Sequence, residues 1–187
     1  MLFRSTLSIT NLIMKTMIDF STIELNKLSK FLSTLSGNTD PTEYFEMGKV
    51  IEYAYQEYSK GQLKRINLIG KDLIDKSGNT YESKKIKYAN KSESAVRGVV
   101  VMNGRSTPDL SRFSPADYYI FTDPDRLKAS CVPGDMLYNI RISGTTITAS
   151  CDPKPEHFFL NGGPVLQENF FQKKVNFYLN YIREIKE

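Results

Sequence analysis

The segment 71–86, which reads KDLIDKSGNTYESKKI, places the strongest local constraint on the fold. Its two halves flank SGN, and a glycine followed by an asparagine is typical of the tight turn that joins two antiparallel strands. Side chains on a strand alternate between two faces with a period of two residues. A hairpin with its turn at Gly78 would therefore gather Asp72, Glu82 and Lys84 on one face.

Two carboxylates beside an ammonium group, without a histidine, suit the hydrolysis of phosphodiester bonds. Asp72 and Glu82 offer the hard oxygen atoms that Mg²⁺ prefers, and a backbone carbonyl can complete the set. The bound ion acidifies an attacking water, and Lys84 can orient that water. Asp75 falls on the opposite face, where we expect a structural role in the turn. The alternative interpretation is an exposed hairpin whose charges are solvated.

Apolar residues recur near a helical period on both sides of the hairpin. The segments 19–36 and 42–60 show this period and each precedes a glycine, which predicts two amphipathic helices. Residues 166–187 return to the same spacing. Short apolar runs at 98–103 and 117–123 are typical of buried strands.

Runs on either side of SGT at 143–145 predict a second hairpin. Helices before and after these strands indicate an α/β fold with a central mixed β-sheet flanked by α-helices. The length of 187 residues suits one such domain. The expected organisation is a loose extension over 1–17 and a single domain over 18–187, with a helical region (18–61), a catalytic sheet (69–150) and a C-terminal helix (166–187).

Charge and composition narrow the classes of function. The net charge of +4 and the pI near 8.9 permit nucleic-acid binding without requiring it. Cys131 and Cys151 are far apart and His157 is the one histidine, which argues against a zinc site. Reduced thiols favour a cytoplasmic protein. No run approaches the roughly 18 apolar residues of a membrane-spanning helix, so no membrane partner is expected.

Residues 70–84 read G-x-D-x-x-D-x-x-G-x-x-Y-E-x-K. This pattern resembles the active-site hairpin of the PD-(D/E)XK nucleases, and within them that of the PvuII-like type II restriction endonucleases. The resemblance implies a restriction-endonuclease-like core in which Asp72 and Glu82 hold Mg²⁺, the Ser83 carbonyl completes the metal shell and Lys84 assists the attacking water. The leading proline of the family is absent, because Lys71 precedes the aspartate.

The resemblance further implies a homodimer that hydrolyses double-stranded DNA at a short specific site. A cognate DNA methyltransferase is then expected in the same system, because a restriction host must protect its own sites. The chain lacks the histidine-rich segment that PvuII-like enzymes place after the hairpin, so the target sequence or the substrate differs. Candidate DNA-binding residues are lysines that would track phosphates and polar residues that would reach base edges: Lys85, Lys87, Lys91, Asn90, Asn103 and Arg105.

Two other interpretations stay open. The same fold serves junction resolvases and repair nucleases, which read the shape of DNA rather than its sequence. A non-enzymatic DNA-binding module or interaction protein could carry the same hairpin as a charged surface.

The helical region raises two smaller expectations. Its aromatic and aliphatic stripe, which includes Tyr44, Ile51 and Tyr55, is expected in the core, with the dimer surface as the alternative. Glu52 and Glu57 could approach the metal site, but solvent exposure is the expectation for both.

Overall fold

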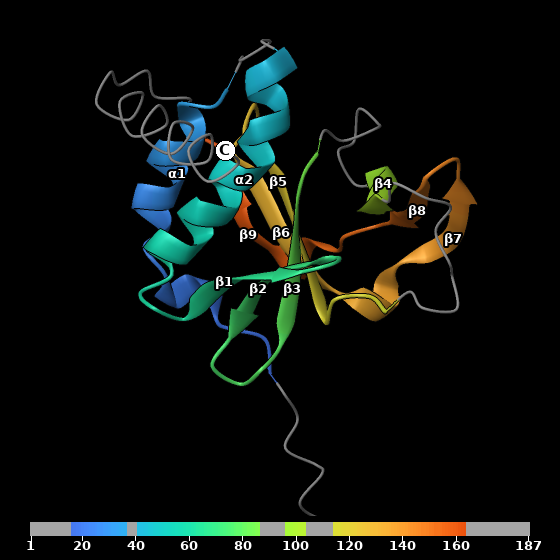
Figure 1. The fold of residues 1–187 in the computed structure, drawn as a ribbon. Coiled ribbons are helices and arrows are strands. Elements are labelled where there is room, and N and C mark those ends of the chain that lie inside the picture. The colour runs from blue at the N-terminus through green and yellow to red at the C-terminus, as the bar shows by residue number, and fades with distance from the viewer. Residues whose placement is uncertain (1–15, 37–40, 87–95, 104–113, 164–187) are drawn as a thin grey trace, which may run out of the picture.

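The computed structural model describes residues 16–36, 41–86, 96–103 and 114–163 (Figure 1). Two helices pack against one face of a six-stranded sheet, and a second, three-stranded sheet lies on its other side (Figure 1). The helices are α1 (Leu25–Ser33) and α2 (Pro41–Tyr58). The strands are β1 (Leu63–Leu68), β2 (Lys71–Asp75), β3 (Thr80–Lys85), β4 (Val96–Asn103), β5 (Tyr118–Asp123), β6 (Lys128–Pro133), β7 (Tyr138–Ser143), β8 (Thr146–Cys151) and β9 (Phe158–Asn161).

The large sheet is mixed, and its strands lie in the order β1-β2-β3-β5-β6-β9. The pair β3–β5 is parallel, whereas every other neighbouring pair in it is antiparallel. The expected α/β fold with a central mixed sheet is therefore confirmed at this level. Among the residues that the structure describes, no helix is long and apolar enough to cross a membrane.

The strands within 69–150 do not form the single sheet that the sequence suggested. Strands β4, β8 and β7 form a separate antiparallel sheet, in that order. Two parallel neighbours such as β3 and β5 need a crossover connection of a dozen or more residues. Here β4 lies within that crossover and pairs with β8 instead of joining the large sheet. The expected C-terminal helix over 166–187 lies outside the described residues.

The helix expected over 19–36 is shorter than its periodicity suggests. Residues Phe20–Thr22 form a separate 3-10 turn, which Asp19 caps by accepting a hydrogen bond from the Ser21 N–H at 2.9 Å. The backbone N–H of Glu24 then donates to Tyr58 at the end of α2. These contacts place an extended link between the turn and α1.

The apolar stripe of α2 belongs to the core, as expected. Ile51, Tyr55 and Tyr58 are buried against the face of the large sheet that carries Leu73. The Tyr55 hydroxyl is 2.6 Å from the Thr122 hydroxyl on β5, which satisfies both buried groups. The side chain of Tyr44 lies outside the described residues.

A second buried cluster fills the space between the two sheets. It includes Tyr119 and Phe121 from β5, Val132 from β6, Val101 from β4 and Ile147 from β8. The large sheet is therefore covered on both faces, and β3 and β5 lie at its centre.

The β2–β3 hairpin has the expected turn, in which Gly78 adopts a positive φ of 83°. Asp75 organises this turn from a buried position. Its carboxylate accepts hydrogen bonds from the backbone N–H groups of Ser77 and Asn79 at 2.9 and 3.0 Å. It also accepts bonds from the Asn79 amide at 2.8 Å and the Tyr81 hydroxyl at 2.7 Å. The structural role expected for Asp75 is confirmed.

We expect Asp75→Ala to lower the free energy of unfolding by about 3 kcal/mol. Several donors lose a charged acceptor, and the buried Tyr81 hydroxyl loses the carboxylate to which it donates. Denaturant unfolding measures this change. The matched control is Asp152→Ala, which removes an exposed carboxylate that accepts one bond from Tyr138. The control should change stability by less than about 0.5 kcal/mol. Equal losses in the two variants would contradict the structural role of Asp75.

Candidate active site

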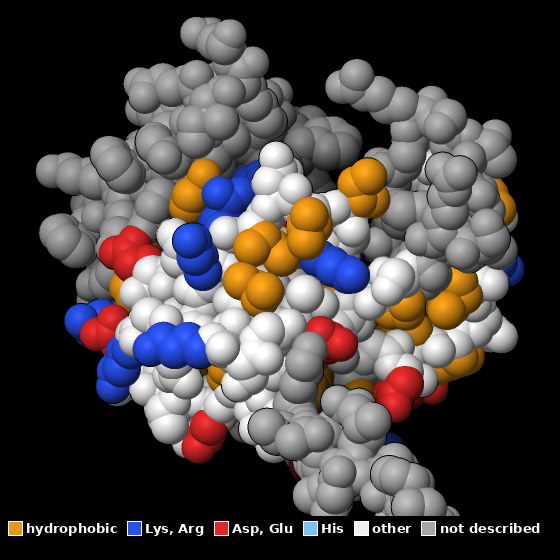
Figure 2. Space-filling view, turned by 60° about the horizontal axis from the view of Figure 1, so that its bottom comes forward, with side chains coloured by type: hydrophobic (Ala, Val, Ile, Leu, Met, Phe, Trp, Pro, Cys, Tyr) orange, Lys and Arg blue, Asp and Glu red, His pale blue; other side chains and the backbone are white. Residues whose placement is uncertain are grey.

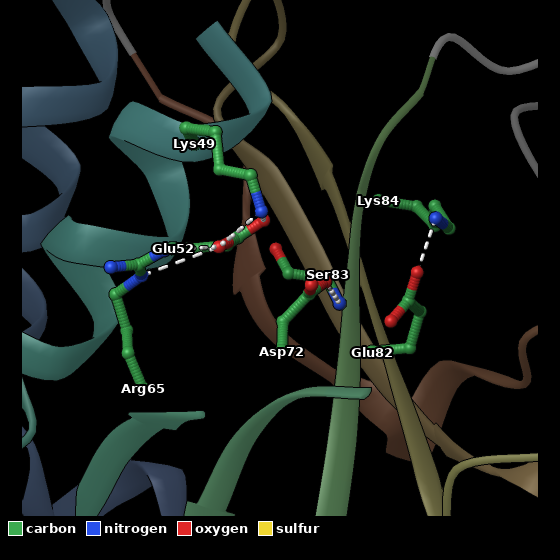
Figure 3. Close-up of polar contacts among 7 residues, drawn as sticks. All are labelled: Lys49, Glu52, Arg65, Asp72, Glu82, Ser83 and Lys84. Atoms are coloured by element: carbon green, nitrogen blue, oxygen red, sulfur yellow. Dashed lines mark hydrogen bonds and ion pairs between the residues drawn. The ribbon is translucent and has the colours of Figure 1, made fainter. Parts of the chain in front are cut away.

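The hairpin places Asp72 and Glu82 at the point where β2 and β3 separate. The antiparallel register pairs Leu73 with Tyr81, and Asp72 and Glu82 are the next residues outward on the two strands. Here the Asp72 carboxylate accepts the backbone N–H of Ser83 at 2.9 Å (Figure 3). A side chain, instead of a backbone carbonyl, thus connects the two strands beside the candidate site.

An irregularity in β1 lies directly across from Asp72. Arg65 pairs with Leu73 and Leu68 pairs with Lys71, so two residues of β1 stand opposite Asp72 alone. Such a bulge bends the strand and changes the direction of nearby side chains, and bulges are frequent beside functional sites.

Glu82 is buried and forms an ion pair with Lys84, which projects from the same side of β3 (Figure 3). Burial raises the pKa of the Glu82 carboxyl to about 7, against the lowering effect of the Lys84 ammonium, and the nearby Asp72 contributes to the rise. Oxygen Oε2 of Glu82 is buried, and the described part of the chain offers it no hydrogen-bond partner. The structure thus brings Asp72, Glu82 and Lys84 into one cluster.

Helix α2 adds a carboxylate that we expected to be exposed. Glu52 is buried, and its side chain points toward Asp72 (Figure 3). Its oxygens accept bonds from Lys49 at 3.2 and 3.3 Å and from Arg65 at 3.3 Å. The expectation was wrong because these two cations accompany the carboxylate into the interior. Glu57, by contrast, is exposed as expected.

The environment of Glu52 resembles that of Glu82 electrostatically. Burial raises the pKa of Glu52 to about 7, and the charge on Asp72 adds to the rise, whereas Lys49 and Arg65 oppose it. The guanidinium of Arg65 also lies over the ring of Tyr53, 3.9 Å from its centroid, which helps to hold it in place. The only sequence signal for this arrangement was the i,i+3 spacing of Lys49 and Glu52 on a helix.

The donor set of this cluster fits a hard divalent cation. Glu82 Oε2 lacks a donor within the described structure, and the adjacent Asp72 carboxylate can only share a proton or a cation with it. No group of three or more His, Cys, Asp or Glu residues with metal-binding geometry occurs among the described residues. Two carboxylates with waters are the usual protein contribution to a Mg²⁺ site.

The structure describes only some of the other residues that the sequence predicted for the site. Ser83 is buried and donates its backbone N–H to Asp72, and its carbonyl as a metal ligand stays a prediction. Lys85 ends β3 and is half-buried. Asn103 ends β4, but its side chain is outside the described part. The remaining candidates lie outside the described residues altogether: Lys87, Asn90, Lys91 and Arg105.

Comparisons of the chain with protein-family models, with curated proteins and with solved structures found no match.

The raised pKa of Glu82 predicts a dependence of stability on pH. Because the folded-state pKa of about 7 exceeds the ordinary value of 4.5 for a glutamate carboxyl, the folded state binds more protons between these two pH values. Stability contributed by the protonated carboxyl is therefore lost as pH rises through this window. We expect Glu82→Gln to reduce the loss by about 3 kcal/mol, since each pKa unit corresponds to about 1.4 kcal/mol. Urea unfolding at pH 5, 6, 7 and 8 measures it.

The matched control is Glu156→Gln, which neutralises an exposed carboxyl far from the hairpin in sequence. This variant should retain the pH dependence of the native protein. A Glu82→Gln curve parallel to the native one would show that the Glu82 carboxyl is ionised in the folded protein across the whole range.

Proposed function

We propose that this protein is a Mg²⁺-dependent type II restriction endonuclease that hydrolyses double-stranded DNA at a short specific site. The observation that carries the proposal is the buried Glu82 carboxylate, which lies between Asp72 and Lys84 and has one oxygen without a donor in the described structure. A solvated surface hairpin would leave these charges in water. Burying them is costly, and such an arrangement is typical of functional sites.

The fold supports a restriction-endonuclease-like core. The hairpin lies within a mixed sheet, and helices precede it in the sequence, as the resemblance of residues 70–84 implies. The order of the cluster in the chain, with the aspartate on β2 and the E-x-K motif on β3, also agrees with that resemblance.

In the proposed site, Asp72, Glu82 and the Ser83 carbonyl would hold Mg²⁺. A bound ion would supply a positive charge that polarises the scissile phosphate and lowers the pKa of a water molecule. The ammonium group of Lys84, which Glu82 holds in place, donates a hydrogen bond to the attacking water or to a phosphate oxygen. Attack in line with the leaving group then produces a 5′-phosphate end, as the resemblance implies.

The charge balance of the site favours a cation. The charge on Asp72 acts on two other carboxyl groups, those of Glu52 and Glu82. The pKa values of about 7 for both glutamates indicate that protons partly neutralise them near neutral pH. A divalent cation can replace these protons, so metal binding and proton release are coupled.

The proposed assembly is a homodimer, because a two-fold axis matches a palindromic site, with a cognate DNA methyltransferase in the same system. Ile51, Tyr55 and Tyr58 are buried within the protein's own core, so this part of the α2 stripe does not supply the dimer contact.

We expect the native protein to cut unmethylated phage DNA into discrete fragments in the presence of Mg²⁺. Glu82→Ala removes a metal ligand and Lys84→Ala removes the cation beside the water, so each should lower the cleavage rate at least about 100-fold. Timed digests on agarose gels measure the rates. Lys27→Ala, which removes an exposed lysine of α1, is the matched control and should cut at the native rate.

Other outcomes have defined meanings. A smear from the native protein would favour a nuclease that reads DNA shape or lacks specificity. Absence of cleavage on linear, plasmid and junction DNA, with Mg²⁺ or with Mn²⁺, would contradict the enzymatic proposal and favour a binding module.

Metal binding can be tested without DNA. At a Mg²⁺ concentration tenfold above its Kd, the native protein should gain about 1.4 kcal/mol of stability, which raises Tm by about 3–5 °C. Asp72→Ala and Glu82→Ala should show no such increase in Tm. In the native protein the increase in Tm should be larger at pH 8 than at pH 6, because Mg²⁺ competes with protons for the carboxylates. Thermal unfolding with and without Mg²⁺ measures the increase in Tm, and the control variant Glu156→Gln should show the native increase. An unchanged response in Glu82→Ala would contradict the site.

A further inference from the structure

The turn between β1 and β2 exposes two large aliphatic side chains. Leu68 is 59% exposed and Ile69 is 83% exposed. Leu68 pairs with Lys71, so the turn itself consists of Ile69 and Gly70 alone. Two-residue hairpin turns usually contain asparagine, aspartate or glycine, because these residues suit both the backbone and the solvent. Gly70 supplies the positive φ that this turn needs, so the backbone of the turn does not require an aliphatic side chain at Ile69.

The tip runs beside the second sheet. Gly70 adopts a positive φ of 70°, and a Cβ atom added to it would lie 3.7 Å from the backbone oxygen of Val101 on β4. The turn backbone thus runs beside β4, while Leu68 and Ile69 project into solvent. Exposed apolar side chains on a tight two-residue turn meet a partner with little loss of conformational entropy.

The tip is continuous with the candidate active site. Lys71 follows the turn directly, and Asp72 is the next residue. Leu68 and Lys71 share a face, because they are opposite partners in an antiparallel pair. On the face shown in Figure 2, hydrophobic side chains gather between Lys and Arg side chains. An apolar projection next to a cation, here Leu68 and Ile69 next to Lys71, is complementary to DNA, whose stacked bases are apolar and whose backbone is anionic.

We propose that Leu68 and Ile69 form a wedge that enters a groove of duplex DNA and partly unstacks a base step near the phosphate to be cut, while Lys71 contacts a neighbouring phosphate. Inserted aliphatic side chains unstack and kink DNA in this way in other proteins. A base step suits the size of this projection, whereas a stable protein interface buries roughly 800 Å² on each partner. The inference rests on the proposed action on duplex DNA.

The wedge has a physical role in the proposed reaction. Unstacking one step bends the duplex and moves the adjacent phosphate relative to the bases, at a cost that depends on the sequence being deformed. The tip would therefore add sequence discrimination at a step that receives no hydrogen bond from the protein.

The test is the linking number of closed circular plasmid DNA. The plasmid is relaxed by a topoisomerase that needs no metal, in EDTA, so that the protein binds without cutting, and the topoisomers are separated on a gel. Unstacking changes the twist and path of DNA, so we expect native protein to shift the topoisomer distribution. Leu68→Ser/Ile69→Ser should bind DNA about tenfold more weakly, which fluorescence anisotropy measures. This variant should give no topoisomer shift even when its concentration is raised until the same fraction of DNA is bound.

Two control variants separate the wedge from charge and from general loss of apolar surface. Ile140→Ser/Ile142→Ser removes two aliphatic side chains of β7 that are 38% and 39% exposed, and should leave the shift and the affinity unchanged. Lys71→Ala should retain the topoisomer shift but reduce the salt dependence of log Kd by about one unit. Leu68→Ser/Ile69→Ser should retain the native salt dependence of log Kd.

Each remaining outcome overturns the wedge in a distinguishable way. DNA binding without a topoisomer shift would overturn the wedge and leave the nuclease proposal intact. Absence of DNA binding under all salt conditions would contradict both the wedge and the nuclease proposal. A topoisomer shift that Leu68→Ser/Ile69→Ser retains would overturn the wedge. A change from dimer to monomer in that variant, measured by analytical ultracentrifugation, would assign the tip to a contact with a second copy of the chain.

Discussion

The register of the β2–β3 hairpin is the constraint on which the candidate site depends. A slip of one residue would move every side chain of a strand to the other face, and Glu82 would then point into the core beneath α2. The buried Asp75 carboxylate prevents such a slip, because it bonds to backbone and side-chain groups on both sides of the turn. A structural aspartate thus determines where a candidate catalytic aspartate, Asp72, meets its partner.

The separation of β2 from β3 is as important as their pairing. A regular ladder would satisfy the Ser83 N–H with a backbone carbonyl and leave no place for a carboxylate between the strands. Here Asp72 accepts that N–H, and the irregularity of β1 opposite it allows β2 to turn away. The Asp72 carboxylate consequently lies near Glu52 of α2 and Glu82 of β3, and its charge adds to the rise that burial causes in the pKa of both glutamates.

The sequence was sufficient for local features and insufficient for pairings between distant segments. Alternation and turn chemistry predicted the hairpin and the structural role of Asp75, since both depend on neighbouring residues. The burial of Glu52 was not predictable, because it requires Arg65 on β1 to approach α2. The pairing of β4 with β8 was likewise not predictable, because a short apolar run indicates a buried strand but does not specify the sheet to which the strand belongs. Strands β1 and β6 were missed, since charged or small residues interrupt their patterns.

The second sheet connects these observations. It covers the face of the large sheet opposite the helices, so Glu82 on β3 lies in a dry environment next to Tyr119 instead of in water. The same sheet runs beside the β1–β2 turn at Val101, and Ile69 at that turn is exposed. The second sheet, built from β4 in the crossover and from the later strands β7 and β8, therefore shields Glu82 from water and runs beside the turn that carries Ile69. The proposed cation site and the proposed wedge both depend on this sheet.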